Sequence, residues 1–256
     1  MGNKRHTTGV NDQHVGLQNR RSGCKSLVVC QADVAQLAEH LASNQKVTSS
    51  TLVIRSILNC RKTEEGIDSM KKLVIHPKDD TTVFLTKAYE RLDDVTLVQG
   101  NVTKNQIRDM ISSHDQTIML GHGTAAGLLS VGQFPGAPGH IIDHSFASQL
   151  AAKNDSVFIW CNADQYVNRY RLSGFSTGMF ISEVSEAYLM GLGSTTQREV
   201  DESNGLFVET IGAVADRGPR LMHAAARHRY GQLANRNRVA KYNHERLYLS
   251  GGGLSI

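Results

Sequence analysis

The residues of this 256-residue chain that most suggest chemistry are one histidine and one cysteine, each directly after an apolar run. His122 follows the run TIMLG (residues 117–121), and Cys161 follows SVFIW (residues 156–160). An imidazole beside a thiol can take up the thiol proton while the sulfur attacks a carbonyl, and can later protonate the leaving amine. The pair therefore indicates covalent acyl transfer if the fold brings the two residues together.

Gly123 provides a further part of such a site. A glycine directly after His122 lets its N–H group approach a substrate carbonyl without a side chain in the way. We expect this N–H group and that of Cys161 to form an oxyanion hole. The predicted catalytic residues are thus His122, Cys161 and Gly123, and the chemistry requires no metal ion and no cofactor.

The elements that must position these residues alternate along the chain. Apolar runs predict a buried strand at residues 73–76, further strands at 95–98 and 117–120, and a core strand at 157–160, and we expect a fifth strand at 178–181. Residues 82–92, the segment after a Thr103/Gln106 capping box, and residues 145–153 have helical spacing, and a small hairpin is expected at 127–134. This alternation predicts a three-layer α/β sandwich with a mostly parallel central sheet. Further helices are expected at 184–190, 205–215 and 219–233.

Ligands and reacting groups gather beyond the carboxyl ends of the strands in an open parallel sheet. His122 and Cys161 stand just past two such ends, and the intervening helix would bring these ends side by side. A single cysteine at a strand end is more often a small buried hydrophobic residue. The joint position of the two residues favours the catalytic interpretation.

The two motifs and the elements between them resemble the caspase-like cysteine peptidases, which include caspases, metacaspases, legumains, gingipains and clostripain. In that family an apolar strand ends in His-Gly, a β-hairpin and a helix follow, and a second apolar strand ends in a cysteine. This chain has TIMLGHG at 117–123, LLSV at 128–131, ASQLAAK at 147–153 and SVFIWCNAD at 156–164. The resemblance covers residues 72–195 and implies a caspase-like cysteine endopeptidase with a His122–Cys161 dyad and Gly123 in the oxyanion hole.

Two acidic residues near these motifs, Asp164 and Glu183, are candidates for the substrate pocket. Asp164 lies shortly after Cys161, and Glu183 follows the expected fifth strand, where caspase-like enzymes build part of their pocket. A carboxylate there would favour a basic side chain before the scissile bond, as the resemblance to gingipains and clostripain also implies. Trp160 differs from the small residue that usually precedes the cysteine in the family, and Asn162 differs from the glycine that commonly follows it.

Two other patterns point to different functions. The segment GHGTAAG at residues 121–127 fits a phosphate-binding loop, but it follows the third strand, and the next residues are β-like rather than helical. Residues 217–256 contain eight Lys or Arg and one acidic residue, a balance that nucleic-acid-binding segments also have. A solvated helix face explains the basic residues more simply, so we do not expect a nucleic-acid partner. The alternative to a peptidase is a catalytically silent α/β domain that binds a nucleotide or a protein.

Composition sets the broad class of the protein. Hydrophobic residues make up 40% and charged residues 20%, which excludes a wholly disordered or fibrous chain. No run approaches the roughly 20 apolar residues of a membrane span, and the first residues lack the apolar centre of a signal peptide. The four cysteines have neither zinc-like spacing nor the density of a disulfide scaffold. We expect a cytoplasmic protein that acts on a protein or peptide substrate and has no membrane partner; its oligomeric state is left open.

Residues 1–69 resemble the translation of a transfer-RNA gene. ADVAQLAEH (32–40) is similar to a translated D-arm and KVTSSTLVIRS (46–56) to a translated T-arm, in the order found in one such gene. Met70, which opens MKKLVIHP, then looks like the true start. We expect residues 1–69 to be a non-native or disordered leader, with no chemistry at Cys24, Cys30 or Cys60, and residues 70–256 to form the α/β domain with a basic helical C-terminal part. The alternative is a genuine N-terminal extension.

Overall fold

The computed structural model describes residues 70–251 of the chain. Its central feature is a six-stranded sheet in the order β2-β1-β3-β7-β8-β9. The first five strands are parallel to one another and β9 is antiparallel to β8. Their bounds are β1 Lys72–Ile75, β2 Val95–Val98, β3 Gln116–Leu120, β7 Ser156–Ile159, β8 Gly174–Thr177 and β9 Leu247–Ser250. The predicted α/β class and mostly parallel sheet are confirmed, whereas the predictions for residues 1–69 lie outside the described residues.

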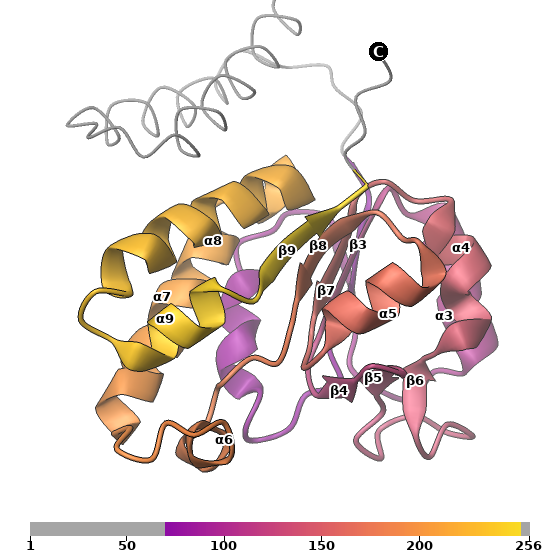
Figure 1. Ribbon diagram of the computed structural model, residues 1–256. Coiled ribbons are helices and arrows are strands. Elements are labelled where there is room, and N and C mark those ends of the chain that lie inside the picture. Colours follow the sequence, from indigo (N-terminus) through magenta and orange to yellow (C-terminus); the bar gives the residue numbers. More distant parts are fainter. Residues whose placement is uncertain (1–69, 252–256) are drawn as a thin grey trace, which may run out of the picture.

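Helices cover both faces of the sheet (Figure 1), and the four inner strands β1, β3, β7 and β8 are buried along their whole length. One apolar core joins Val74, Ile118 and Val157 to a layer containing η2 (Val83–Ala88), α7 (Gln197–Gly212), α8 (Pro219–Leu233) and α9 (Arg238–His244). The opposite core joins Leu73, Met119 and Phe158 to α3 (Lys104–Ser113), α4 (Ala147–Ala151) and α5 (Ala163–Tyr170). We refer to the two helical layers as the α7/α8 layer and the α3/α5 layer. Alternate residues of each strand therefore enter opposite layers, as the pleat requires.

Local sequence signals account for several element boundaries. The expected capping box begins α3: the Gln106 N–H donates to Thr103 Oγ1 (3.3 Å) and the Thr103 N–H donates to Gln106 Oε1 (2.8 Å). Helix α6 (Val184–Leu189) begins with a similar reciprocal arrangement of Glu183 and Glu186. Helix α8 has Pro219 in its first turn, where the missing N–H is not needed. Between residues 70 and 251 no helix is both long and apolar enough to cross a membrane.

Other boundaries differ from the prediction. The fifth parallel strand is Gly174–Thr177 and not 178–181. Ser176 and Thr177 of this strand are fully buried between neighbouring strands, so the strand has no run of apolar residues that would mark it. The apolar residues just after it do not belong to the sheet: Phe180, for example, packs on Phe207 of α7, with 4.7 Å between the ring centroids. The expected helix at 82–92 is the shorter 3-10 helix η2. Helix α5 and strand β9 were not predicted.

The expected hairpin is part of a second, three-stranded antiparallel sheet. Its strands are β4 (Gly123–Thr124), β5 (Gly127–Leu129) and β6 (His140–Ile142), in that order. It starts directly after His122 and lies at the carboxyl edge of the main sheet (Figure 1). The chain then passes through the short helix η3 (His144–Phe146) and α4 before it enters β7.

Candidate active site

His122 and Cys161 follow two neighbouring parallel strands at equivalent positions. Leu120 of β3 pairs with Ile159 of β7, and each candidate residue lies two positions beyond its member of this pair. The Gly121 N–H donates to the Ile159 carbonyl at 3.1 Å, which continues the ladder past the end of the strands. Because neighbouring strands are about 4.8 Å apart, this register brings the backbones of the two candidate residues side by side.

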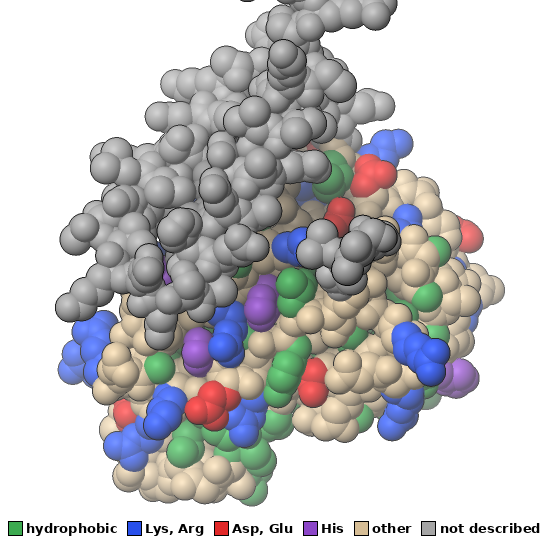
Figure 2. Space-filling view, turned by 45° about the horizontal axis from the view of Figure 1, so that its top comes forward, with side chains coloured by type: hydrophobic (Ala, Val, Ile, Leu, Met, Phe, Trp, Pro, Cys, Tyr) green, Lys and Arg blue, Asp and Glu red, His purple; other side chains and the backbone are tan. Residues whose placement is uncertain are grey.

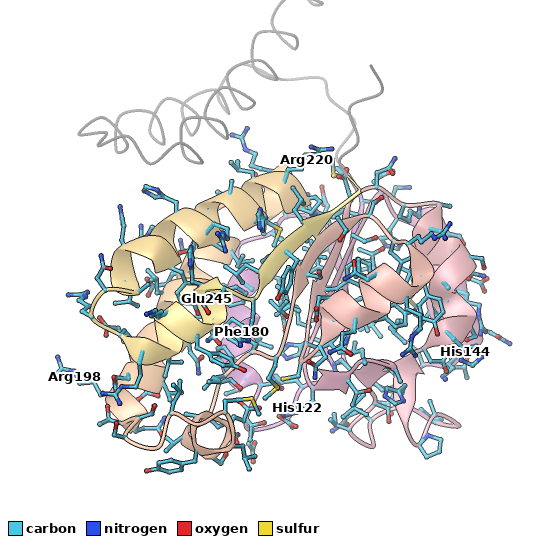
Figure 3. All side chains as sticks on the ribbon, in the orientation of Figure 1. His122, His144, Phe180, Arg198, Arg220 and Glu245 are labelled. Carbon is cyan, nitrogen blue, oxygen red and sulfur yellow. The ribbon has the colours of Figure 1, made fainter. Side chains whose placement is uncertain are left out.

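Both side chains lie on the side of the sheet that carries the α7/α8 layer. Leu120 and Ile159, the last residues of the two strands, belong to the core of that layer. Cys161 accordingly contacts Phe180, which belongs to the same core, and His122 contacts the loop that leads into η2. Figure 3 shows His122 and Phe180 at the same end of the central strands.

Cys161 rests as a protonated thiol. Its Sγ donates a hydrogen bond to the Phe180 carbonyl at 3.6 Å. Burial raises the pKa of the thiol to about 11, and the negative charge of Glu186 acts in the same direction, while the bond to Phe180 opposes them. A base must therefore remove the proton when the sulfur reacts.

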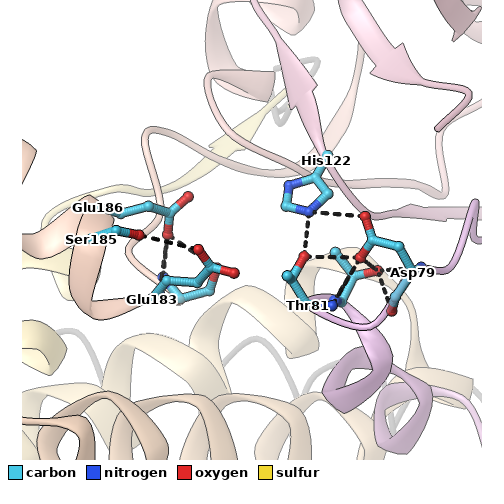
Figure 4. Close-up of polar contacts among 8 residues, drawn as sticks. Asp79, Thr81, His122, Glu183, Ser185 and Glu186 are labelled. Atoms are coloured by element: carbon cyan, nitrogen blue, oxygen red, sulfur yellow. Dashed lines mark hydrogen bonds and ion pairs between the residues drawn. The ribbon is translucent and has the colours of Figure 1, made fainter.

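His122 is oriented by the loop that follows β1 (Figure 4). Its Nε2 lies 2.6 Å from Thr81 Oγ1 and 3.3 Å from Asp79 Oδ2. The Thr81 hydroxyl donates its single proton to Asp79 Oδ1 at 2.9 Å, so its oxygen accepts a hydrogen bond from the Nε2–H group of His122. In this tautomer Nδ1 carries the free lone pair, and within residues 70–251 it has no hydrogen-bond partner. Nδ1 is thus the nitrogen available as a base.

Asp79 is held as a carboxylate by its loop. Partial burial acts to raise its pKa, but hydrogen bonds from Thr81 and Thr82 and the nearby His122 outweigh it, so the pKa is lowered. Oδ1 accepts from the Thr81 N–H and the Thr82 N–H, both at 3.0 Å, and Oδ2 faces His122. Sequence reasoning missed Asp79 and Thr81. The available signal was their position in KDDTT, directly beyond the carboxyl end of the first strand.

Two backbone N–H groups beside the dyad have no backbone partner among residues 70–251. The Leu129 N–H donates to the His122 carbonyl (2.8 Å), which makes Gly123 and Leu128 a non-hydrogen-bonded pair. In such a pair the N–H of Gly123 points away from β5. The N–H of Cys161 donates no hydrogen bond within the described part of the chain. These two groups are the ones expected to form the oxyanion hole.

Gly123 is also required for packing. A Cβ at this position would lie 2.1 Å from Cδ1 of Trp160 and 2.8 Å from the Gly127 carbonyl oxygen. Trp160 is buried, and its Nε1–H donates to the Thr124 carbonyl (3.1 Å). The indole of Trp160 therefore packs directly against β4, and there is no room for a side chain at position 123.

Two glutamates stand across from His122 in the close-up view (Figure 4). The predicted pocket residue Glu183 is the N-cap of α6, and its carboxylate accepts a hydrogen bond from Ser185 Oγ (3.2 Å). Glu186, which sequence reasoning missed, has Oε2 held by Ser182 N–H (2.7 Å), Ser182 Oγ (3.1 Å) and Glu183 N–H (3.1 Å). These bonds fix the carboxylate of Glu186 at the start of α6, close enough to Cys161 to affect the thiol.

The other predicted pocket residue, Asp164, lies in the first turn of α5. Burial raises its pKa, an effect that backbone hydrogen bonds partly oppose. Its Oδ1 is buried without a hydrogen-bond partner among the described residues. In the same part of the chain no hydrogen bond or ion pair connects Asp164 to His122 or Cys161, so its contacts do not join it to the dyad.

The glycine-rich segment at residues 121–127 does not form a phosphate-binding loop. Residues 123–129 form the β4–β5 hairpin, and no helix begins there as a phosphate-binding loop would require. Residues 70–251 contain no group of three or more His, Cys, Asp or Glu that could hold a metal ion.

Comparison with protein-family models, curated proteins and solved structures finds no match to this chain.

Proposed function

We propose that the protein is a caspase-like cysteine endopeptidase with Cys161 as nucleophile and His122 as general base and acid. The observation that carries the proposal is the joint geometry at two paired strand ends. A partly buried thiol and an imidazole oriented by Thr81 and Asp79 follow the Leu120–Ile159 pair and lie on the same side of the sheet. A nucleophile, a base and a group that orients the base are the recurring parts of covalent acyl transfer.

The proposed reaction begins with rotation of the Cys161 thiol away from the Phe180 carbonyl. His122 Nδ1 takes the thiol proton as Sγ forms a bond to the substrate carbonyl carbon, and the N–H groups of Gly123 and Cys161 hold the oxyanion. The C–N bond then breaks, and His122 gives its proton to the leaving amine. Water then attacks the resulting thioester as His122 takes one of its protons. The C–S bond breaks, the carboxylic acid product leaves, and the Cys161 thiolate takes the proton back from His122.

The order of the elements supports the caspase-like assignment. Strand β3 ends in Gly121-His122-Gly123, the β4–β5–β6 sheet and α4 follow, and β7 leads into Cys161. This is the sequence of elements that the family resemblance implies. The competing interpretation, a silent nucleotide- or protein-binding domain, would leave the oriented imidazole and the free N–H of Gly123 without a role.

Carboxylates at the starts of α5 and α6 support a preference for a basic residue before the scissile bond. Glu183 and Glu186 are partly buried at the start of α6, and Asp164 is partly buried at the start of α5. A desolvated carboxylate paired with a guanidinium contributes about 1.5–3 kcal/mol. We therefore propose roughly ten- to hundredfold discrimination in favour of Arg or Lys.

Hydrolysis of reporter peptides tests the proposed function. Three acetylated peptides with a fluorogenic amide, identical except for Arg, Leu or Asp before the scissile bond, are compared with the full chain. The Arg peptide should have the highest kcat/KM, and Cys161→Ala should abolish its hydrolysis. Activity that persists in Cys161→Ala would refute the assigned nucleophile, and a preference for Asp would refute the carboxylate pocket.

A further inference from the structure

The last turn of α6 exposes an unusual amount of apolar surface next to the candidate site. Tyr188 is 54% exposed, Leu189 79% and Met190 38%, and the three are consecutive. Figure 2 shows hydrophobic side chains gathered at the lower left, in the region of α6. Such a cluster beside a reactive centre is typical of a binding surface.

A short path of contacts connects this surface to Cys161. Cys161 Sγ bonds the Phe180 carbonyl, and two residues later the Ser182 N–H bonds Glu186 of α6. Leu189 ends α6 three positions after Glu186 and so continues the same face of the helix, about 5–6 Å further along, and the C-cap residue Met190 follows it. The helix face that begins with the carboxylate near the nucleophile thus becomes apolar within one turn.

The proposed mechanism defines which part of a substrate meets this face. His122 protonates the leaving amine, so the residues after the scissile bond lie toward His122. The residues before the bond then lie on the other side, toward Glu186, which stands across from His122 in Figure 4 and is close enough to affect the Cys161 thiol. In an extended peptide, side chains two positions apart point the same way and are about 6–7 Å apart. This separation is close to that between Glu186 and Leu189.

We propose that the substrate carries a large apolar residue two positions before its basic residue, and that this side chain packs on Leu189 at the end of α6 and on the C-cap residue Met190. The inference rests on the proposed peptidase function and extends it from one substrate residue to a motif of the form apolar-x-basic. The middle residue of this motif points away from α6 and contributes little to recognition.

Three acetylated fluorogenic peptides test the motif with the full chain. Leu-Ala-Arg has the apolar residue in register, Ser-Ala-Arg lacks it, and Ala-Leu-Arg has it one position out of register. For the wild-type protein, kcat/KM for Leu-Ala-Arg should exceed that for Ser-Ala-Arg by about tenfold, the effect of burying one leucine side chain. Leu189→Ser should reduce this ratio to within about twofold of unity and leave hydrolysis of Ser-Ala-Arg and Ala-Leu-Arg unchanged.

Leu97→Ser is the matched control, because Leu97 is 43% exposed but lies on the edge strand β2. It should leave all three values unchanged. A ratio near one in the wild-type protein, or a high ratio that persists in Leu189→Ser, would overturn the inference and leave the peptidase assignment intact. A changed sedimentation coefficient of Leu189→Ser without a changed ratio would identify the surface as an interface between copies and would also overturn it. If the wild-type protein hydrolyses none of the peptides and its Cys161 resists a peptide electrophile, the proposed function itself fails and the inference fails with it.

Discussion

A short relay of hydrogen bonds fixes the orientation of the His122 ring. Nε2–H donates to Thr81 Oγ1, and the Thr81 hydroxyl donates to Asp79 Oδ1. Asp79 Oδ2, 3.3 Å from Nε2, also stabilises the imidazolium that forms when Nδ1 takes a proton. Asp79 is therefore a positioning residue whose effect on hydrolysis passes through His122.

Asp79→Asn removes the negative charge but keeps a similar shape. We expect kcat/KM for the preferred peptide to fall about ten- to hundredfold, because the imidazole loses its fixed orientation and the support for its charged form. Asp80→Asn is the control, since Asp80 is the exposed neighbour in the same loop. Equal activity of the two variants would show that Asp79 does not act through His122.

Glu186 influences the resting thiol. Because burial and then the Glu186 charge raise the Cys161 pKa to about 11, the reactive thiolate fraction of the free protein rises about tenfold per pH unit across the neutral range. Glu186→Gln keeps an oxygen that can cap α6 but removes the charge, so the pKa should fall and iodoacetamide alkylation of Cys161 at pH 8 should accelerate. Alkylation is followed by mass spectrometry of the peptide that contains Cys161. Glu183→Gln is the control, and an equal acceleration in that variant would contradict the specific role of Glu186.

The sequence predicts His122, Cys161 and Gly123 because each follows an apolar strand, and strand ends can be located from hydrophobic runs. Asp79 and Glu186 could not be selected in this way. Carboxylates are common on protein surfaces, and what distinguishes these two is the course of the loops after β1 and β8. That course depends on long-range contacts that no local pattern encodes.

At the scale of elements, the β4–β5 hairpin and Trp160 form one packed unit beside the site. Gly123→Ala would force its Cβ against the indole and the Gly127 carbonyl oxygen. We expect a loss of about 1–3 kcal/mol, seen as a Tm lowered by several degrees, together with reduced hydrolysis. Gly139→Ala is the control because a Cβ there meets no atom within 4 Å. A Gly123→Ala variant with unchanged Tm would contradict the close packing.

The elements themselves were predictable to different degrees. The four apolar strands and the capped helix α3 are confirmed because their signals are local. Strand β8 was placed too late because its fully buried Ser176 and Thr177 are small enough to fit between sheet neighbours, and polar residues do not mark a strand. Helix α5 has αL residues at both ends, Asn162 and Arg171, which gave no recognisable cap in the sequence.

At the scale of the whole molecule, residues 1–69 share no hydrophobic pattern with the strands and helices that line the two apolar cores of the described residues. We therefore expect that a chain starting at Met70 folds alone and keeps its Tm within the few degrees that about 1 kcal/mol would produce. Thermal unfolding followed by circular dichroism compares it with the full chain. A large decrease in Tm would mean that residues 1–69 stabilise the domain, and the transfer-RNA interpretation of this segment would be abandoned.

The central claim is that Cys161 and His122 act as one catalytic pair, and covalent labelling tests it most directly. The full chain is treated at pH 7.5 with a peptide acyloxymethyl ketone that carries Arg next to the electrophile, and the modified residue is identified by tandem mass spectrometry. We predict stoichiometric modification of Cys161, none at Cys24, Cys30 or Cys60, and labelling of His122→Ala at least about a hundredfold slower. Slow labelling spread over all four cysteines, at a rate unaffected by His122→Ala, would contradict the claim.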